Sequence, residues 1–198
     1  MASPRSIGQI KSALLNPSLT SKFSISIVPP TVLSSFLNNT TNDNFNLSCS
    51  EASLPGSSLN TQEITDDHHG VTERNAYRRM YDDRIDLTFY VEGEKYTQIR
   101  YFETWINFIV GDDTRDARVG REYNYKVKFP NDYKTRMFVT KFEKNHGLNL
   151  TYTFVDTYPI AINSMPLSYG STDILKCTVS MTYLRYIVED DIRLQNPL

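Results

Sequence analysis

Apolar residues recur at every second position over much of this chain, which is the period of a β-strand with one buried face. The alternation comes in short runs that end at residues typical of turns, mainly Gly, Pro and Asn. It predicts strands at Phe23–Ile27, Phe45–Ser50, Ile85–Val91, Tyr123–Phe129, Met137–Phe142, Leu148–Phe154 and Ile174–Tyr183. In the second of these strands, Phe45, Leu47 and Cys49 are expected to face the core.

One stretch has the period of a helix instead. Between Lys95 and Val110 the apolar positions are separated by three, four and three residues, at Ile99, Phe102, Ile106 and Ile109. Trp105 is expected beside this stripe, and Gly111 is expected to end the helix. Strands, one helix and further strands predict a mainly β fold, an antiparallel β-sandwich or barrel with one packed α-helix.

The length and composition suit one folded unit. The chain has 198 residues, of which 39% are hydrophobic and 12% aromatic. Residues 1–21 mix Ser, Pro, Asn and Gly with a short apolar group at Ile10–Leu15, which predicts an N-terminal arm. We expect residues 22–198 to form a single domain. A net charge of −2 argues against a protein that holds nucleic acid tightly.

The segment Ser57–Asp83 is too polar for a core element and long for a connection. The run from Arg74 to Arg84 interleaves basic and aromatic residues, at Arg74, Tyr77, Arg78, Arg79, Tyr81 and Arg84. These six residues are the candidate subunit interface, because Arg and Tyr are enriched at protein–protein contacts. Two alternatives stay open: an exposed hairpin with ordinary surface charge, and a DNA-binding segment, although the nearby Asp82 and Asp83 would repel phosphates.

No pattern in the sequence supports catalysis or a bound cofactor. The chain has no Gly-x-Ser-x-Gly elbow, no phosphate-binding loop and no Gly-x-Gly-x-x-Gly motif. Asp66, Asp67, His68 and His69 are consecutive, but adjacent histidines lack the spacing that aims both at one metal ion. His146 is expected in a hairpin turn. We therefore expect a non-enzymatic protein with no catalytic residues, no cofactor and no metal.

The two cysteines and the absence of long apolar runs bear on the compartment. Cys49 and Cys177 each lie in an apolar-alternating run, which favours buried, reduced thiols over a disulfide. The N-terminal residues include no signal-peptide pattern, and no later run has the length of a membrane span. We therefore expect a protein that is made and kept in a cytoplasm, with no membrane partner.

Several short motifs, taken together in their order, resemble a known family. The block Ser48–Gly56 is similar to the strand and the A-x-L-P turn near the start of phage tail tube proteins. In that family a long β-hairpin loop ends in an acidic pair before a strand, here Asp82-Asp83. Phe102 and Trp105 match the F-x-x-W spacing of the family's single helix, and Tyr152–Ser180 resembles its closing segment.

The chain thus resembles the tail tube protein of T-even-like contractile-tailed bacteriophages over residues 20–188. The resemblance implies a structural subunit that forms hexameric rings, which stack head to tail into a tube lined by a continuous β-barrel. It also implies contacts with tail sheath, baseplate and tape-measure proteins, and DNA that passes through the lumen without specific binding. The protein would then belong to the virion tail tube and would be assembled in the cytoplasm of a host bacterium.

The wall of such a lumen is expected to carry small hydroxyl groups and some acidic groups, because a cationic lining would trap phosphates. The Ser and Thr faces of segments 45–50 and 174–183 are the candidate wall. Two other functions stay open. One is a tube-initiating baseplate or tail-terminating paralogue, and the other is a soluble binding module or enzyme of an unrecognised family.

Overall fold

The structure is a computed structural model of the chain, and it describes residues 18–31, 33–34, 44–65, 70, 72–111, 126–143, 149–170 and 172–190. Within these ranges the strands are β1 (Phe23–Ile27), β2 (Cys49–Ala52), β3 (Ser57–Ile64), β4 (Glu73–Tyr81), β5 (Arg84–Tyr90), β6 (Thr135–Phe142), β7 (Asn149–Ile162), β8 (Lys176–Thr182) and β9 (Arg185–Asp190). The helices are α3 (Thr97–Val110) and the four-residue α4 (Pro130–Tyr133), and a helical turn spans 44–47.

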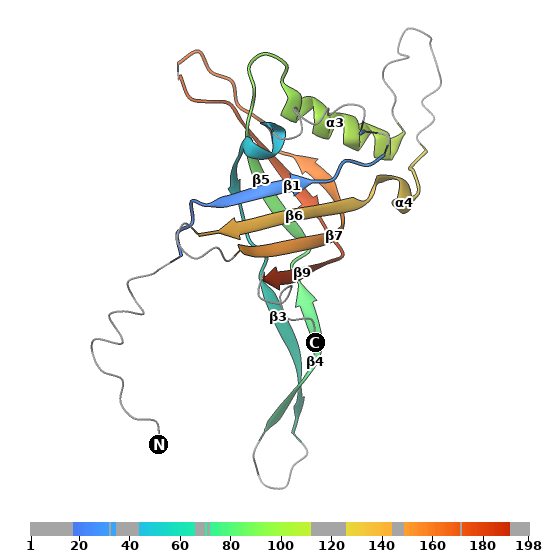
Figure 1. The fold of residues 1–198 in the computed structure, drawn as a ribbon. Coiled ribbons are helices and arrows are strands. Elements are labelled where there is room, and N and C mark those ends of the chain that lie inside the picture. Colours follow the sequence, from blue (N-terminus) through green and yellow to red (C-terminus); the bar gives the residue numbers. More distant parts are fainter. Residues whose placement is uncertain are drawn as a thin grey trace, which may run out of the picture.

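Seven antiparallel strands follow the order β1-β6-β7-β8-β5-β2, with β9 paired to β7. They make two layers: sheet A contains β1, β6, β9 and the first half of β7, and sheet B contains β2, β5, β8 and the second half of β7. Figure 1 shows the strands of the two layers crossing, with α3 along one end. The predicted antiparallel sandwich with one packed helix is confirmed, and because β1 and β2 do not pair, it is not a closed barrel.

β7 belongs to both layers because it changes partners near Asp156. Its residues 150–155 pair with β9, whereas Tyr158–Ile162 pair with β8. The pairing with β6 shifts register in the same place, which marks a β-bulge in β7. Asp156 has a φ of 59°, in the left-handed region. Asp tolerates this region better than most residues that carry a Cβ.

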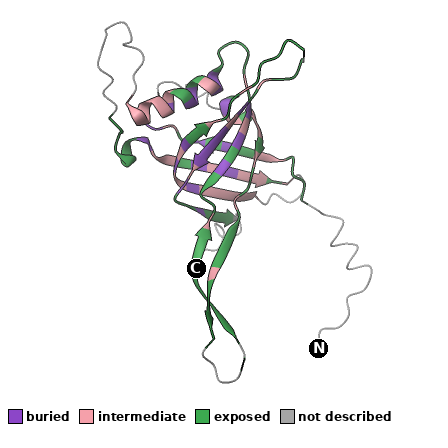
Figure 2. Cartoon of the chain, turned by 180° about the vertical axis from the view of Figure 1, so that it is seen from behind, coloured by how far each residue is buried: buried purple, intermediate pink, exposed green. Residues whose placement is uncertain are grey.

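The core lies between the two layers, where strand alternation predicts it. Ile25 and Ile27 of β1 are buried, and so are Ile85, Leu87 and Phe89 at every second position of β5. One row of buried side chains crosses all four strands of sheet A, at Ile27, Met137, Phe154 and Tyr186. Buried residues gather in the middle of the two layers, while the hairpin of β3 and β4 is exposed along its length (Figure 2).

α3 packs on the core through an aromatic face that differs from the predicted stripe. Tyr101, Phe102 and Trp105 have no exposed surface, whereas Ile106 and Ile109 are half-buried. The helix therefore buries its aromatic side chains in preference to Ile106 and Ile109, because large rings bury more apolar area than isoleucine side chains. Trp105, predicted at the flank, lies at the centre, and its indole Nε1–H donates a hydrogen bond of 3.1 Å to a main-chain carbonyl of α4.

The end of α3 explains why the predicted strand at Tyr123–Phe129 is wrong over its described residues. α3 ends at Gly111, as predicted, and Gly111 has a φ of 80°. A Cβ there would lie 2.7 Å from the Lys126 carbonyl oxygen, and the Lys128 N–H donates to the Ile109 carbonyl at 2.9 Å. Residues 126–129 therefore run against the helix end and form no strand.

The predicted strand at Phe45–Ser50 is wrong in its first half. Residues 44–47 form a helical turn, closed by a 2.6 Å hydrogen bond from the Ser48 hydroxyl to the Phe45 carbonyl. Phe45 is 1% exposed, whereas Leu47, expected to face inwards, is 77% exposed. Three apolar residues are too few to separate a strand period from a helical turn. The strand itself begins at Cys49.

The last strand, β9, has no counterpart in the prediction. The run Ile174–Tyr183 contains β8, but Ile174 lies outside it and is 68% exposed. The chain then turns at Leu184 and returns beside β7, from the pair Val155↔Arg185 to the pair Leu150↔Asp190. Charged residues at both ends of β9 obscure its short apolar alternation.

Replacing Asp156 with Val should destabilise the protein by about 1–2 kcal/mol, because a β-branched residue is strained at a positive φ. Asp156→Gly is the matched control and should be neutral or slightly stabilising, because glycine has no Cβ to strain. Urea unfolding followed by tryptophan fluorescence measures both changes. An equal loss in the two variants would contradict the backbone explanation.

Candidate assembly interface

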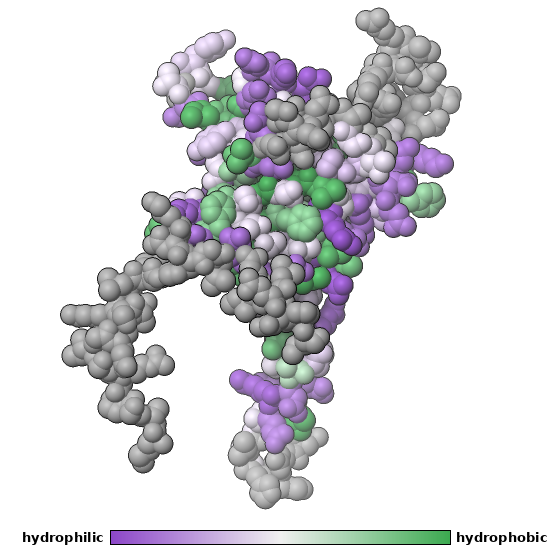
Figure 3. All heavy atoms as spheres, in the orientation of Figure 1, coloured by the Kyte–Doolittle hydropathy of each residue, from purple (hydrophilic) through white to green (hydrophobic). Residues whose placement is uncertain are grey.

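The segment Ser57–Asp83 contains an antiparallel hairpin, in which β3 and β4 pair from Ser57↔Tyr81 to Ile64↔Glu73. It projects from the body on the side away from α3 (Figure 1). Nearly all of its residues are exposed, and much of its visible surface is hydrophilic (Figure 3). A two-stranded hairpin with no packed face is marginally stable by itself. This geometry therefore favours a contact with another chain.

The base of the hairpin is held to the body by two of the predicted interface residues. The Arg79 guanidinium lies over the rings of Tyr81 and Tyr186, 4.7 Å and 5.3 Å from their centroids. Its Nη2 also donates to the Tyr186 hydroxyl at 3.3 Å. The two tyrosine rings meet edge to face, with centroids 5.3 Å apart. These contacts attach β4 to β9.

Two hydrogen bonds between side chains and the Gly56 main chain close the same base. The Gly56 N–H donates to the Asp82 carboxylate at 2.7 Å, and the Tyr186 hydroxyl donates to the Gly56 carbonyl at 3.3 Å. A Cβ at Gly56 would lie 3.1 Å from the Asp82 Oδ2, which makes the approach close. Asp82, the first residue of the acidic pair noted in the sequence, therefore fixes where the hairpin begins and ends.

The other four predicted interface residues are exposed. Arg74 forms an ion pair of 2.8 Å with Glu63 across the hairpin, and such an exposed pair contributes little stability. Tyr77 is the extra residue of a β-bulge in β4 and is 65% exposed. Arg78 and Arg84 are exposed as well. Arg79 is exposed as well, so the six residues differ in their contacts: Arg79 and Tyr81 contact Tyr186, and the other four lie on the surface.

The outer faces of the two layers differ in their side chains. On sheet B the Thr88 and Thr178 hydroxyls lie 3.1 Å apart, and the Ser180 hydroxyl donates to the Asp86 carboxylate at 2.5 Å. This face has the hydroxyl and acidic groups expected of the segment 174–183. Of the segment 45–50, only Cys49 and Ser50 lie in a strand, and the Ser50 hydroxyl donates to the Thr88 carbonyl at 3.2 Å. The outer face of sheet A adds large apolar side chains, at Phe138, Phe142 and Ile187.

The described part of the chain has no group of three or more His, Cys, Asp and Glu residues that could hold a metal ion. Asp66, Asp67, His68, His69 and His146 lie outside the described residues. That they bind no metal and catalyse nothing therefore stays a prediction. Over the same described ranges, no helix has both the length and the apolar character needed to cross a membrane.

Cys49 and Cys177 are unpaired, as predicted. Cys177 has no exposed surface and Cys49 is half-buried. Burial raises the pKa of the Cys49 thiol to about 12 and that of the Cys177 thiol to about 11. Because the thiolate is the reactive form, neither cysteine is suited to nucleophilic or redox chemistry near neutral pH.

The fold is that of solved tail-tube-type proteins. A chain in the extended sheath–tube complex of an extracellular contractile injection system (PVC) superposes with a TM-score of 0.53 at 18% identity, covering 94% of this chain and 99% of that one. The sheath/tube terminator of PVC gives 0.54 at 16% identity, covering 88% and 97%. The tube-terminating cap of the anti-feeding prophage also gives 0.54 at 16%, covering 88% and 91%.

The sequence identifies the family directly. This chain belongs to the phage tail tube protein family, because the sequence model described as "Phage tail tube protein" matches residues 18–189. No curated protein sequence matches the chain significantly. The family places the protein among structural components of virion tails.

Arg79→Ala should destabilise the folded chain by about 1–2 kcal/mol, because it removes contacts to two rings and a hydroxyl group. Arg78→Ala removes the same side chain one residue earlier, on the side of β4 that faces away from Tyr186, and should change stability by less than about 0.5 kcal/mol. Chemical denaturation of both variants measures the difference. Equal stabilities would show that the hairpin base does not depend on Arg79.

Both cysteines should resist iodoacetamide in the native protein at mildly alkaline pH and react fully in denaturant, as intact-protein mass spectrometry would show. Their pKa values are raised above the ordinary 9.0 in the folded chain. Their contribution to stability is therefore present below that value and is lost as the pH rises towards 11 and 12. Fast alkylation of the native protein would contradict this description of the two sites.

Proposed function

We propose that this chain is the repeating subunit of a tail tube of the T-even-like contractile type. In this proposal its copies form hexameric rings that stack head to tail into a conduit for DNA ejection. Membership of the phage tail tube protein family supports the structural role. The observation that carries the stacking is the projecting hairpin of β3 and β4, whose exposed surface is available to a neighbouring ring.

The dimensions of the hairpin suit such a contact. β4 has nine residues, which at a rise of about 3.3 Å each give a length of about 30 Å. Along the axis, this projection would contact a different surface of the next copy. Such a heterologous contact does not close, so a filament can grow, whereas the contacts between neighbours within one ring close after a full turn. The exposed residues Arg74, Tyr77, Arg78 and Arg84 are the proposed contact surface, and Arg79 and Tyr81 set its direction.

We assign the lumen wall to the outer face of sheet B. Its half-buried Thr88 and Thr178 and its exposed Asp86 offer hydroxyl and carboxylate groups, which would let DNA pass without binding it specifically. Ser180 is buried and supports the Asp86 carboxylate from behind. The outer face of sheet A, with Phe138 and Ile187, suits a protein contact better, because apolar side chains gain from burial.

Sheath, baseplate and tape-measure proteins are the proposed partners, in addition to further copies of this chain. Among the similar solved structures, one comes from a sheath–tube complex and another from a baseplate, which supports this choice. Assembly would take place in the cytoplasm of the host bacterium. We propose no enzymatic activity, no cofactor, no metal and no membrane partner, and we keep residues 1–21 as an arm and 22–198 as one domain.

A tail-terminating or tube-initiating paralogue is the second candidate. The terminator and cap structures superpose about as well as the sheath–tube chain, with TM-scores of 0.54, 0.54 and 0.53. The fold alone is therefore compatible with either role. Electron microscopy of the purified protein separates them, because a tube subunit gives long tubes, a terminator gives isolated rings, and a soluble binding module stays monomeric.

Arg78→Glu should keep the fold and prevent tubes from forming. Losing one charge-assisted contact costs on the order of 2 kcal/mol at each interface, and the loss recurs at every added ring. Arg78→Lys keeps the charge and is the matched control. Circular dichroism reports the fold, and light scattering with microscopy reports the polymer.

Normal tubes from Arg78→Glu at the wild-type concentration would remove Arg78 from the proposed contact. Arg79 is left unchanged in this test, because reversing its charge would also disturb the hairpin base. A loss of assembly could then no longer be separated from a change in the fold.

A further inference from the structure

A groove opens between the two strands that end the sheet order. Its volume is about 840 Å³, and β1 and β2 on either side are unpaired along their outer edges within the described residues. Its lining includes five apolar side chains, those of Leu19, Phe23, Ala52, Leu54 and Val139. Val139 is a buried core residue, so the groove reaches into the space between the two layers.

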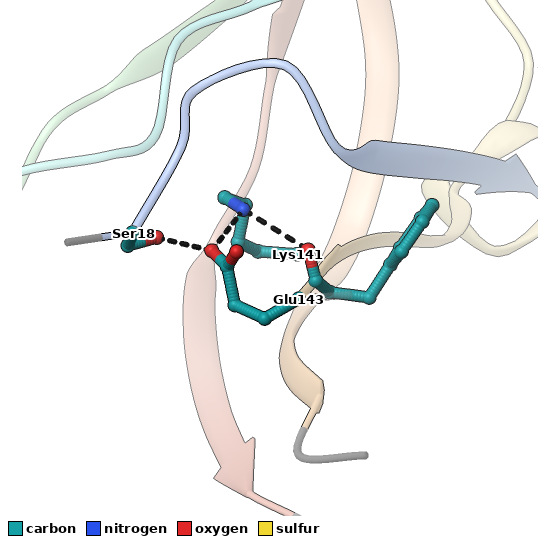
Figure 4. A network of polar contacts seen from close by, with 4 residues as sticks. Ser18, Lys141 and Glu143 are labelled. Atoms are coloured by element: carbon teal, nitrogen blue, oxygen red, sulfur yellow. Dashed lines mark hydrogen bonds and ion pairs between the residues drawn. The ribbon is translucent and has the colours of Figure 1, made fainter. Parts of the chain in front are cut away.

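The chain enters the body at the mouth of this groove. The Ser18 hydroxyl donates to the Glu143 carboxylate at 2.5 Å, and the Lys141 ammonium donates to the same oxygen at 2.6 Å (Figure 4). The hydrogen bonds from Lys141 and Ser18 lower the pKa of the Glu143 carboxyl, so the carboxylate stays charged near neutral pH. Ser18 is thereby fixed at the end of β6, and residues 18–21 form part of the groove wall.

The segment that precedes Ser18 contains apolar side chains that could fill the groove. It carries Ile7, Ile10, Leu14 and Leu15. Leu15 and Leu14 come three and four residues before Ser18, a distance of at most about 10–14 Å along an extended chain. Both side chains can therefore reach the lining residues from the point where Ser18 is held.

We propose that this groove binds the chain's own N-terminal segment, with Leu14 and Leu15 filling the apolar cavity between β1 and β2. A short tether gives the segment an effective concentration on the order of millimolar. Its own segment therefore has an advantage over the same segment of a second copy at ordinary protein concentrations. The bound segment covers the free edge of β2, and covering an edge strand prevents unwanted pairing with other chains.

This inference is independent of the tube proposal. It concerns the unassembled subunit and needs no ring or filament. A failure of the arm experiment below would leave the microscopy of tubes unaffected, and a chain that forms no tubes could still bind its own arm.

The test uses the full chain with paired cysteines. Leu15→Cys combined with Leu54→Cys should form a disulfide within one chain under mild oxidation of dilute protein. The control pair, Leu15→Cys with Leu184→Cys, should stay reduced, because Leu184 is exposed beside the opposite end of sheet A. Both variants also carry Cys49→Ser, because the native Cys49 is half-buried and precedes the groove residue Ser50. Mass spectrometry of the linked peptides then identifies the pair. A link between two chains, or no link above the control, would overturn the proposal.

Hydrogen exchange tests the same contact without oxidation. Leu14→Asp with Leu15→Asp should speed amide exchange at Ser50–Ala52 and Leu54, since the groove would lose its cover. Ser6→Asp with Asn16→Asp adds the same charge to the arm and keeps both leucines, so exchange should match the wild type. Equal exchange in the two variants would mean that the leucines do not occupy the groove.

Discussion

The aromatic cluster between α3 and sheet B fixes parts of the subunit that are far apart in the sequence. The Phe45 ring lies 5.0 Å from that of Tyr101, 5.3 Å from that of Phe89 and 5.6 Å from that of Phe102. Each such pair contributes about 0.5–1.5 kcal/mol beyond the burial of area. Phe45 precedes β2 and Phe89 lies in β5, and the hairpin extends between these two strands. The cluster therefore holds α3 and the segment before β2 against β5, the strand that follows the hairpin.

Neighbouring residues of the hairpin have different roles: some attach it to the body and others form its outer surface. Arg79 and Tyr81 face Tyr186 and stabilise the attachment to the body, while the exposed Arg78 lies on the other side of the strand. Consecutive residues in a strand point to opposite sides, so Arg78 and Arg79 have different surroundings although they are adjacent and identical. A surface contact can thus be changed without changing the fold.

The sequence predicts the strands with clean alternation and fails where another constraint is stronger. β1, β5, β6 and β8 follow the period of two, since each buries one face against the core. Phe45 departs from the strand alternation because its ring packs against aromatic rings of β5 and α3. Packing between segments that are distant in the sequence leaves no local sequence pattern. Six candidate interface residues were found from composition. The sequence could not predict which of them attach the hairpin to the body, because their partner Tyr186 lies more than a hundred residues away from Arg79. It belongs to a strand that the alternation did not reveal.

The sharing of β7 has a mechanical consequence. In its first half the strand is hydrogen-bonded to β6 and β9, and in its second half to β8. A pull on either layer therefore passes along one continuous backbone into the other, and the layers cannot slide apart unless β7 itself is stripped from its neighbours. The bulge at Asp156 lets the strand bend without interrupting that connection. The two layers of the subunit should therefore resist shear together and lose their structure in one cooperative step.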